Sequence, residues 1–123
     1  MADKNVQDIA RRAQACRQLL EDKKGLDCQL INLEGRSSLA DYFVLASGSS
    51  VPHVRALADY VEEYLEKEEA LCPLRQEGRD TGRWILLDYG DFVVHVFHEE
   101  ERAFYSLDRL WEKTEGGLKL RHD

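Results

Sequence analysis

The stretch from Asp41 to Val54 reads DYFVLASGSSVPHV, and it decides the fold. Residues 42–46 are an unbroken apolar run, which is too short for a helix and typical of a buried strand. Gly48, Ser49 and Ser50 then break the strand, and Pro52 stands where the first turn of a helix begins. A buried strand that runs through a short turn into a helix predicts a single α/β or α+β domain.

The segments on both sides extend this pattern. The helix after the turn carries one apolar stripe, formed by Val54, Leu57, Ala58, Val61 and Leu65. Helical spacing also covers residues 5–24, and a strand is predicted over residues 26–34. A third strand near residues 71–76 would complete a right-handed parallel β-α-β unit with the strand before the helix.

The second half of the chain predicts a hairpin. Strands over residues 83–88 and 92–98 are joined at Gly90-Asp91, a glycine-first pair that suits a tight antiparallel turn. Short helices follow over residues 99–105 and 107–113. The sum is a mixed five-stranded sheet flanked by helices, in one domain that spans residues 1–123 with its core at about 5–113 and a flexible tail over 114–123.

Composition limits the function. The chain has 123 residues, of which 43% are hydrophobic and 33% charged, so it is neither a disordered tail nor a membrane protein. It carries 17 Lys and Arg against 24 Asp and Glu, a net charge of −7. Nucleic-acid binding without sequence preference depends on clustered cations, so this balance argues against it as the main activity. An acidic surface would still attract a basic protein partner.

The cysteines and the N-terminus indicate a compartment. Cys16, Cys28 and Cys72 are odd in number and far apart, which disfavours a disulfide framework or a zinc site and favours a reducing cytoplasm. The first residues contain no apolar leader, and no apolar run is long enough to span a membrane.

Enzymatic readings find little support in the sequence. The turn of Gly48, Ser49 and Ser50 before a helix resembles a phosphate site of nucleotidyltransferases, but the two metal-holding carboxylates on a following strand are missing. Such a turn equally serves as a helix cap. His95 and His98 are three apart, and on a strand they face opposite ways, so we expect no metal and no cofactor.

The hairpin is the remaining candidate site. Alternation puts Trp84, Leu86 and Asp88 on one face and Ile85, Leu87 and Tyr89 on the other. An exposed Trp84 would suit the centre of a protein interface, whereas the same periodicity also allows a core residue. Asp88 and Asp91 flank the turn and are equally suited to forming it or to contacting a partner.

Three ordered groups of residues resemble the signatures of the Iojap and ribosomal silencing factor family, RsfS in bacteria. The groups are residues 41–44 with Gly48, Ser50, His53 and Val54; Glu77-Gly78 with Trp84, residues 88–91, Val94, His95 and Phe97; and Glu101, Arg102, Phe104, Tyr105, Leu107, Leu110 and Trp111. The resemblance covers about residues 5–113. Asp108 stands where Glu is commoner in the family.

The resemblance implies a nucleotidyltransferase-like fold without the catalytic acids, and no enzymatic activity. It implies binding to the large ribosomal subunit through ribosomal protein L fourteen, which blocks association with the small subunit and represses translation when nutrients are scarce. The implied contact residues are Trp84, Asp88, Tyr89, Gly90 and Asp91, with Arg102 and Tyr105 in support. It also implies a homodimer when free, with no membrane and no primary nucleic-acid contact.

Two other functions stay open on the sequence alone. Organellar relatives are linked to large-subunit assembly, which would use the same interface. A nucleotidyltransferase remains a third reading because of the Gly48-Ser49-Ser50 turn.

Overall fold

The two most apolar strands form the middle of the sheet. The computed structural model describes residues 6–35 and 40–105. In it, β2 (Tyr42–Gly48) is buried throughout and β5 (Phe92–His98) is buried along all but its last residue. The two strands pair in parallel, with Tyr42 opposite Phe92. Strands covered on both faces read as continuous apolar runs, so the sequence pattern of residues 42–46 is accounted for.

Three further strands complete the sheet. β1 (Leu26–Asn32) pairs antiparallel with β2, and β4 (Trp84–Asp88) pairs antiparallel with β5. β3 (Arg75–Glu77) pairs antiparallel with β4, which gives the order β1-β2-β5-β4-β3. The predicted mixed five-stranded sheet is confirmed.

The position of β3 differs from the prediction. The strand expected near residues 71–76 forms at Arg75–Glu77, and it is separated from β2 by β5 and β4, so the predicted direct β-α-β pairing is wrong. All three residues of β3 are exposed, and two of them are charged, which suits the edge of a sheet rather than its centre. The apolar β5 takes the place beside β2 instead, and the connection between these parallel neighbours contains α2, β3 and β4.

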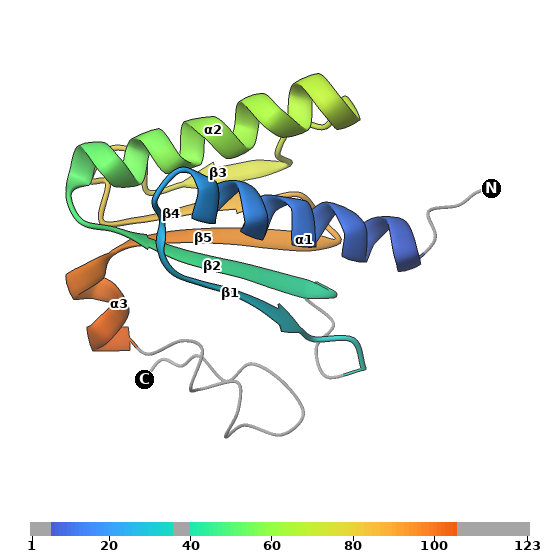
Figure 1. The fold of residues 1–123 in the computed structure, drawn as a ribbon, viewed down its shortest axis with the longest axis horizontal. Coiled ribbons are helices and arrows are strands. Elements are labelled where there is room, and N and C mark those ends of the chain that lie inside the picture. Colours follow the sequence, from blue (N-terminus) through green and yellow to red (C-terminus); the bar gives the residue numbers. More distant parts are fainter. Residues whose placement is uncertain (1–5, 36–39, 106–123) are drawn as a thin grey trace.

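Two helices cover one face of the sheet. α1 (Val6–Asp22) and α2 (Val51–Glu69) lie on the same side, while α3 (Glu99–Tyr105) lies at one end on the other side (Figure 1). α2 begins as predicted, because the Ser50 hydroxyl accepts a hydrogen bond from the His53 amide and Pro52 occupies the first turn. The helix predicted over residues 107–113 and the tail lie outside the described residues. Within the described ranges, no helix is long and apolar enough to cross a membrane.

The sheet has a hydrophobic cluster on each face. The cluster beneath α1 and α2 is the larger one and includes Leu20, Val44, Leu57, Ile85 and Val94. The second cluster lies on the opposite face, which we call the outer face, and consists of Leu33, Ala40, Phe43, Leu45, Val93 and Phe97. Trp84, Leu86 and Ile31 are half-buried and pack against this second cluster. The hairpin therefore contributes to both clusters.

Candidate functional site

The β4–β5 hairpin divides its side chains between the two faces as the alternation predicted. Ile85 and Leu87 are fully buried in the cluster beneath the helices. Trp84, Leu86 and Asp88 alternate with them and are half-buried. The hairpin closes at Gly90, whose φ of 88° is the left-handed backbone that a glycine-first turn requires, and the Tyr89 amide donates to the Phe92 carbonyl at 3.0 Å.

Trp84 is held in one position on the outer face. Its ring lies 4.8 Å from the Phe97 ring, centroid to centroid, and its indole Nε1–H donates to Nδ1 of His95 at 3.1 Å. The backbone of Gly78 packs closely against that of Trp84, because a Cβ on Gly78 would overlap the Trp84 carbonyl oxygen. The sequence left open whether Trp84 is a core residue or an exposed interface residue. In the structure it is half-buried, and its ring is held in place by Phe97 and His95.

Asp88 helps to form the turn. One carboxylate oxygen accepts from the Gly90 amide at 2.8 Å, and the other lies 3.4 Å from Nε of Arg75. The Asp88 side chain is 22% exposed, so it remains reachable at the end of the hairpin away from Trp84. Asp91 follows in the turn, and its carbonyl accepts from the Asp41 amide at 2.8 Å.

Tyr89 does not share the outer face with Trp84. Its side chain is only 8% exposed and belongs to the cluster beneath the helices, where its ring stacks on Phe92 at 5.3 Å. Burial raises the pKa of the Tyr89 hydroxyl above its usual value. The side chain therefore supports the turn from the core.

Arg102 is a buried cation at the far end of β5. Its guanidinium donates to the Ser47 hydroxyl at 3.0 Å and to the Asp27 carbonyl at 2.9 Å, and it lies 5.9 Å from the Phe97 ring. These contacts fasten α3 to β1 and β2. Tyr105 ends α3, and its side chain lies outside the described part of the chain.

Comparison with known proteins assigns the chain to a family. The family model described as "Ribosomal silencing factor during starvation" matches residues 6–122. The chain belongs to the ribosomal silencing factor family. It is 40% identical over 111 residues to the ribosomal silencing factor RsfS of Bacillus subtilis, which covers 90% of this chain and 88% of that protein.

Other members of the ribosomal silencing factor family and a related organellar protein agree with this assignment. A crystal structure from Chromobacterium violaceum superposes with a TM-score of 0.77 at 32% identity, over 96% of this chain and 95% of that one. The mouse protein named "Mitochondrial assembly of ribosomal large subunit protein 1" is 33% identical over 76% of this chain and 42% of its own length. The predicted family is therefore confirmed.

In this member of the family, the polar groups of the Gly48-Ser49-Ser50 turn bond to the helix that follows it. The Ser49 amide donates to Nδ1 of His53 at 3.1 Å, and the Ser50 hydroxyl accepts from the His53 amide at 3.2 Å. Gly48 allows close approach, because a Cβ there would lie 2.9 Å from a Val54 methyl group. These contacts are those of a helix cap rather than of a phosphate cradle.

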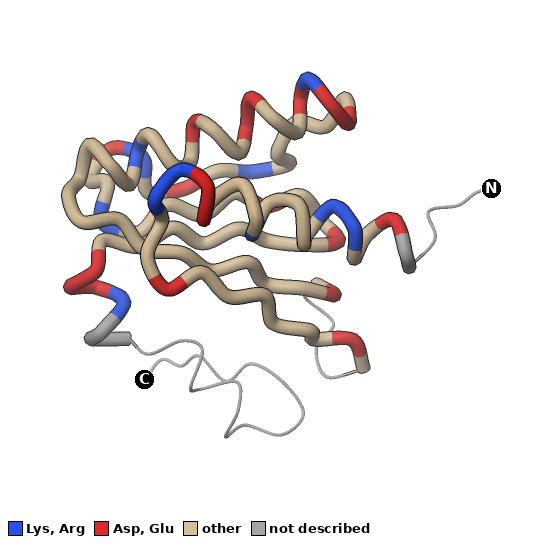
Figure 2. Tube along the Cα trace, viewed as in Figure 1, with Lys and Arg blue, Asp and Glu red and all other residues tan. Residues whose placement is uncertain are grey.

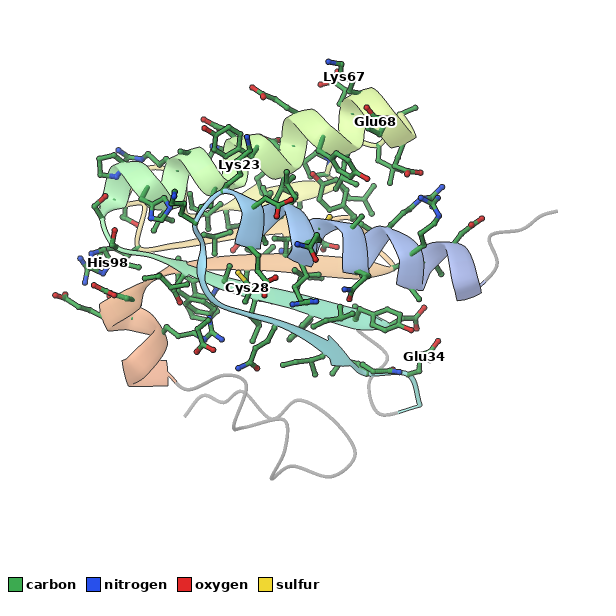
Figure 3. The ribbon with its side chains drawn as sticks, viewed as in Figure 1. Lys23, Cys28, Glu34, Lys67, Glu68 and His98 are labelled. Atoms are coloured by element: carbon green, nitrogen blue, oxygen red, sulfur yellow. The ribbon has the colours of Figure 1, made fainter. Side chains whose placement is uncertain are left out.

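The two histidines of β5, His95 in the middle of the strand and His98 at its end, lie in different surroundings. His98 lies beside the start of α3 (Figure 3), where its Nδ1 accepts from the Glu100 amide at 3.2 Å, whereas His95 lies on the outer face against Trp84. Within residues 6–35 and 40–105, no group of three or more His, Cys, Asp or Glu side chains is arranged to hold a metal ion.

The cysteines are free thiols in different surroundings. Cys16 lies on the buried side of α1, and Cys28 on β1 (Figure 3) packs against the same cluster. Burial raises the pKa of Cys16 to about 12 and that of Cys28 to about 11, so both thiols stay protonated at neutral pH.

Leu74, beside the hairpin, and His95, within it, were not among the site residues expected from the sequence. Leu74 is 76% exposed, and a Cβ on Gly90 would lie 3.2 Å from its Cδ1. Its amide donates to the Asp88 carbonyl at 2.7 Å, so it sits at the same end as the turn. The signal in the sequence is an apolar residue between Pro73 and Arg75 that fits no helix or strand stripe. His95 is the second: it belongs to the residues that resemble the family's signatures, but no contact role was predicted for it.

Charged side chains are frequent on two helices, α2 on the helix-covered face of the sheet and α3 at one end of the outer face. Acidic residues recur along α2, on the helix-covered side (Figure 2). Several arginines pair with carboxylates nearby: Arg12 with Glu69 at 2.9 Å, Arg79 with Asp59 at 2.8 Å, and Arg83 with Glu101 at 3.1 Å. The outer face is by contrast mostly apolar, with Asp88 at its margin.

Proposed function

We propose that this protein is a ribosomal silencing factor that binds the large ribosomal subunit through ribosomal protein L fourteen. Occupying that site would block joining of the small subunit and so repress translation under nutrient limitation. The family match over residues 6–122 carries the proposal. The half-buried Trp84 with its fixed ring, on a face that none of the described helices covers along its length, supports the choice of docking surface.

The docking surface would combine an apolar anchor with a polar margin. Trp84 and Leu86 would supply the contact area, while Asp88, Gly90 and Asp91 would meet a basic partner at the turn. Tyr89 and Arg102 are buried, so their part would be to hold the turn and α3 in place. The mechanism needs no chemistry at the site, because occupancy alone keeps the small subunit away.

Sedimentation with purified subunits tests the proposal. Wild-type protein should travel with large subunits and not with small subunits through a sucrose gradient, and Trp84→Ala should weaken this at least roughly 30-fold, as expected for a central anchor. Tyr60→Ala is the matched control, since Tyr60 is an exposed aromatic residue on α2, away from the outer face. Equal binding by a folded Trp84→Ala variant would refute the assigned surface.

A role in large-subunit assembly is the second candidate, favoured by the similarity to the mouse protein whose name describes such a role. A deletion strain separates the two functions. Accumulated precursor particles would indicate assembly, whereas excess joined ribosomes during starvation would indicate silencing. A rise in melting temperature with nucleotide and magnesium would instead revive the nucleotidyltransferase reading.

The free protein is proposed to be a homodimer that uses the same outer face. An apolar face of this kind would be covered by a second copy until the ribosomal partner replaces it. Sedimentation equilibrium over a range of concentrations tests this proposal. A wild-type monomer at all concentrations would refute it, and a dimer unaffected by Trp84→Ala would exclude the outer face.

A further inference from the structure

His95 is a polar side chain in the middle of an apolar cluster. It lies on β5 between Leu45 of β2 and Leu86 of β4, and its side chain is fully enclosed, with only 4% of the residue exposed. Its ring centroid lies 4.5 Å from that of Phe43 and 6.1 Å from that of Phe97. Nothing in this setting favours a histidine over a leucine or a phenylalanine for packing alone.

The hydrogen bond to Trp84 fixes the chemical state of this ring. An indole Nε1–H is a donor only, so Nδ1 of His95 must accept the bond of 3.1 Å. A neutral imidazole with an accepting Nδ1 carries its proton on Nε2, and a charged imidazolium would have no lone pair to offer Trp84. Burial supports the neutral form, because it lowers the pKa of His95 to about 3.

The second ring nitrogen of His95, Nε2, lowers the stability of the folded protein. Nε2 of His95 is buried without a hydrogen-bond partner. A buried donor that lost its water contacts on folding destabilises the protein, and native structures contain few such groups. The benefit that offsets this cost must come from the one bond that the ring does make, and that bond goes to the proposed anchor of the docking surface.

We propose that His95 is the positioning residue of the docking surface, which holds the Trp84 indole in its binding orientation before the partner arrives. This inference rests on the proposed function. Phe97 packs against the indole ring and Gly78 leaves room for the Trp84 carbonyl oxygen, while the bond to His95 sets the direction of Nε1. A side chain ordered in advance loses less freedom on binding.

The same bond predicts the chemistry that Trp84 offers. The single N–H of the indole is already used inside the protein, so the partner meets the carbon edge of the ring. The matching site on the partner is therefore expected to be apolar rather than a carbonyl oxygen.

Two replacements of His95 separate positioning from packing. His95→Leu removes the acceptor and keeps apolar volume, whereas His95→Asn keeps an oxygen acceptor near the Nδ1 position. Large-subunit affinity should fall roughly 3- to 10-fold for His95→Leu and recover most of that loss for His95→Asn, since one immobilised side chain is involved. The melting temperature of His95→Leu should not fall in parallel, because the leucine also removes the unpaired buried Nε2 of His95, which offsets the lost bond to Trp84.

A spectroscopic readout follows the indole itself. In a Trp111→Phe background, Trp84 is the one tryptophan, and its indole N–H resonance and fluorescence anisotropy report its hydrogen bond and its mobility. His95→Leu should shift that resonance and lower the anisotropy. An unshifted resonance would overturn the proposal at its first step, and an altered resonance with wild-type affinity would overturn the positioning role.

A double-mutant cycle with Trp84→Phe keeps the test decisive. Phenylalanine lacks the N–H, so His95→Leu should change affinity little in the Trp84→Phe background if His95 acts through this bond. A full 3- to 10-fold effect in that background would refute the mechanism. If wild-type protein fails to bind large subunits, the proposed function fails, while the indole resonance still reports whether His95 holds Trp84.

Discussion

Acidification from pH 7.5 to pH 5.5 should destabilise the fold through His95, and replacing this residue by asparagine should remove that part of the loss. In the folded protein, desolvation lowers the pKa of His95 to about 3 from an ordinary value of 6.5, Asp88 raises it and Arg102 lowers it further. The folded state therefore keeps His95 neutral throughout this range. The unfolded chain exposes the same imidazole to water and takes up a proton near pH 6.5.

The size of the effect follows from this difference in protonation. Because the unfolded state binds more protons, the free energy of unfolding rises with pH over the range between the two pKa values of His95. At pH 5.5 the unfolded imidazole is roughly nine-tenths protonated, and the wild type should have lost about 1.4 kcal/mol that His95→Asn does not lose. The result depends little on the folded pKa, provided that it lies well below 5.5.

Urea unfolding followed by circular dichroism measures the effect. Wild type and His95→Asn are compared at both pH values, and every other titrating group is present in both proteins, so the difference between the two changes isolates His95. Equal losses in the two proteins would mean that His95 is protonated or accessible in the folded state. That result would also contradict the accepting role of Nδ1 toward Trp84.

Three further variants test other contacts. Gly78→Ala should cost more than about 3 kcal/mol of stability, because the new Cβ would overlap the Trp84 carbonyl oxygen at a position that also has a positive φ. Gly35→Ala is the control, with a positive φ but open space around it, and it should cost about 1–2 kcal/mol. Equal losses of stability in thermal unfolding would contradict this reasoning. Leu74→Ser should leave stability within about 0.5 kcal/mol and weaken large-subunit binding about 10-fold, and unchanged binding would remove Leu74 from the docking surface. Arg102→Met should cost about 2–3 kcal/mol and speed hydrogen exchange in α3, and wild-type exchange there would show that other contacts hold the helix.

Local patterns predicted the elements whose neighbours in space are also near in sequence. The turn at Gly90-Asp91 sets the register of the hairpin, and once Tyr89 faces Phe92, counting along both strands puts Leu86 opposite His95. The contact between Trp84 and His95 is a diagonal pair in that register, so it was available from the sequence. Neither the spacing of His95 from His98 nor the family resemblance points to Trp84, so this hydrogen bond was not predicted.

The pairing of β2 illustrates what local patterns lack. The order strand, helix, strand predicted that the segment near residues 71–76 would pair with β2. The parallel partner of β2 is instead β5, more than forty residues away, because the central strand of the sheet, covered on both faces, must be apolar on both. The charges of Arg75 and Glu77 already marked that segment as an edge strand.

The burial of Arg102 depends on a feature with no local signal. Its guanidinium reaches the carbonyl of Asp27, which is turned toward it at an irregularity in β1 where the register with β2 shifts and where Asp27 has a φ of 49°. Such a bulge cannot be read from residues 26–32, because it arises from the pairing of β1 with β2. The sequence could therefore name Arg102 as a supporting residue but not explain how it supports.

Charged and apolar residues lie on different parts of the sheet, and we expect them to affect different steps of binding. Many of the acidic residues behind the net charge of −7 lie along α2, and the middle of the proposed docking surface lies on the other face of the sheet. Charges that are not in the contact act at a distance, so they should raise the rate of encounter with a basic partner without holding the complex together. Trp84, fixed by His95, would govern the rate of dissociation. Added salt should therefore slow association, and the loss of Trp84 should speed dissociation.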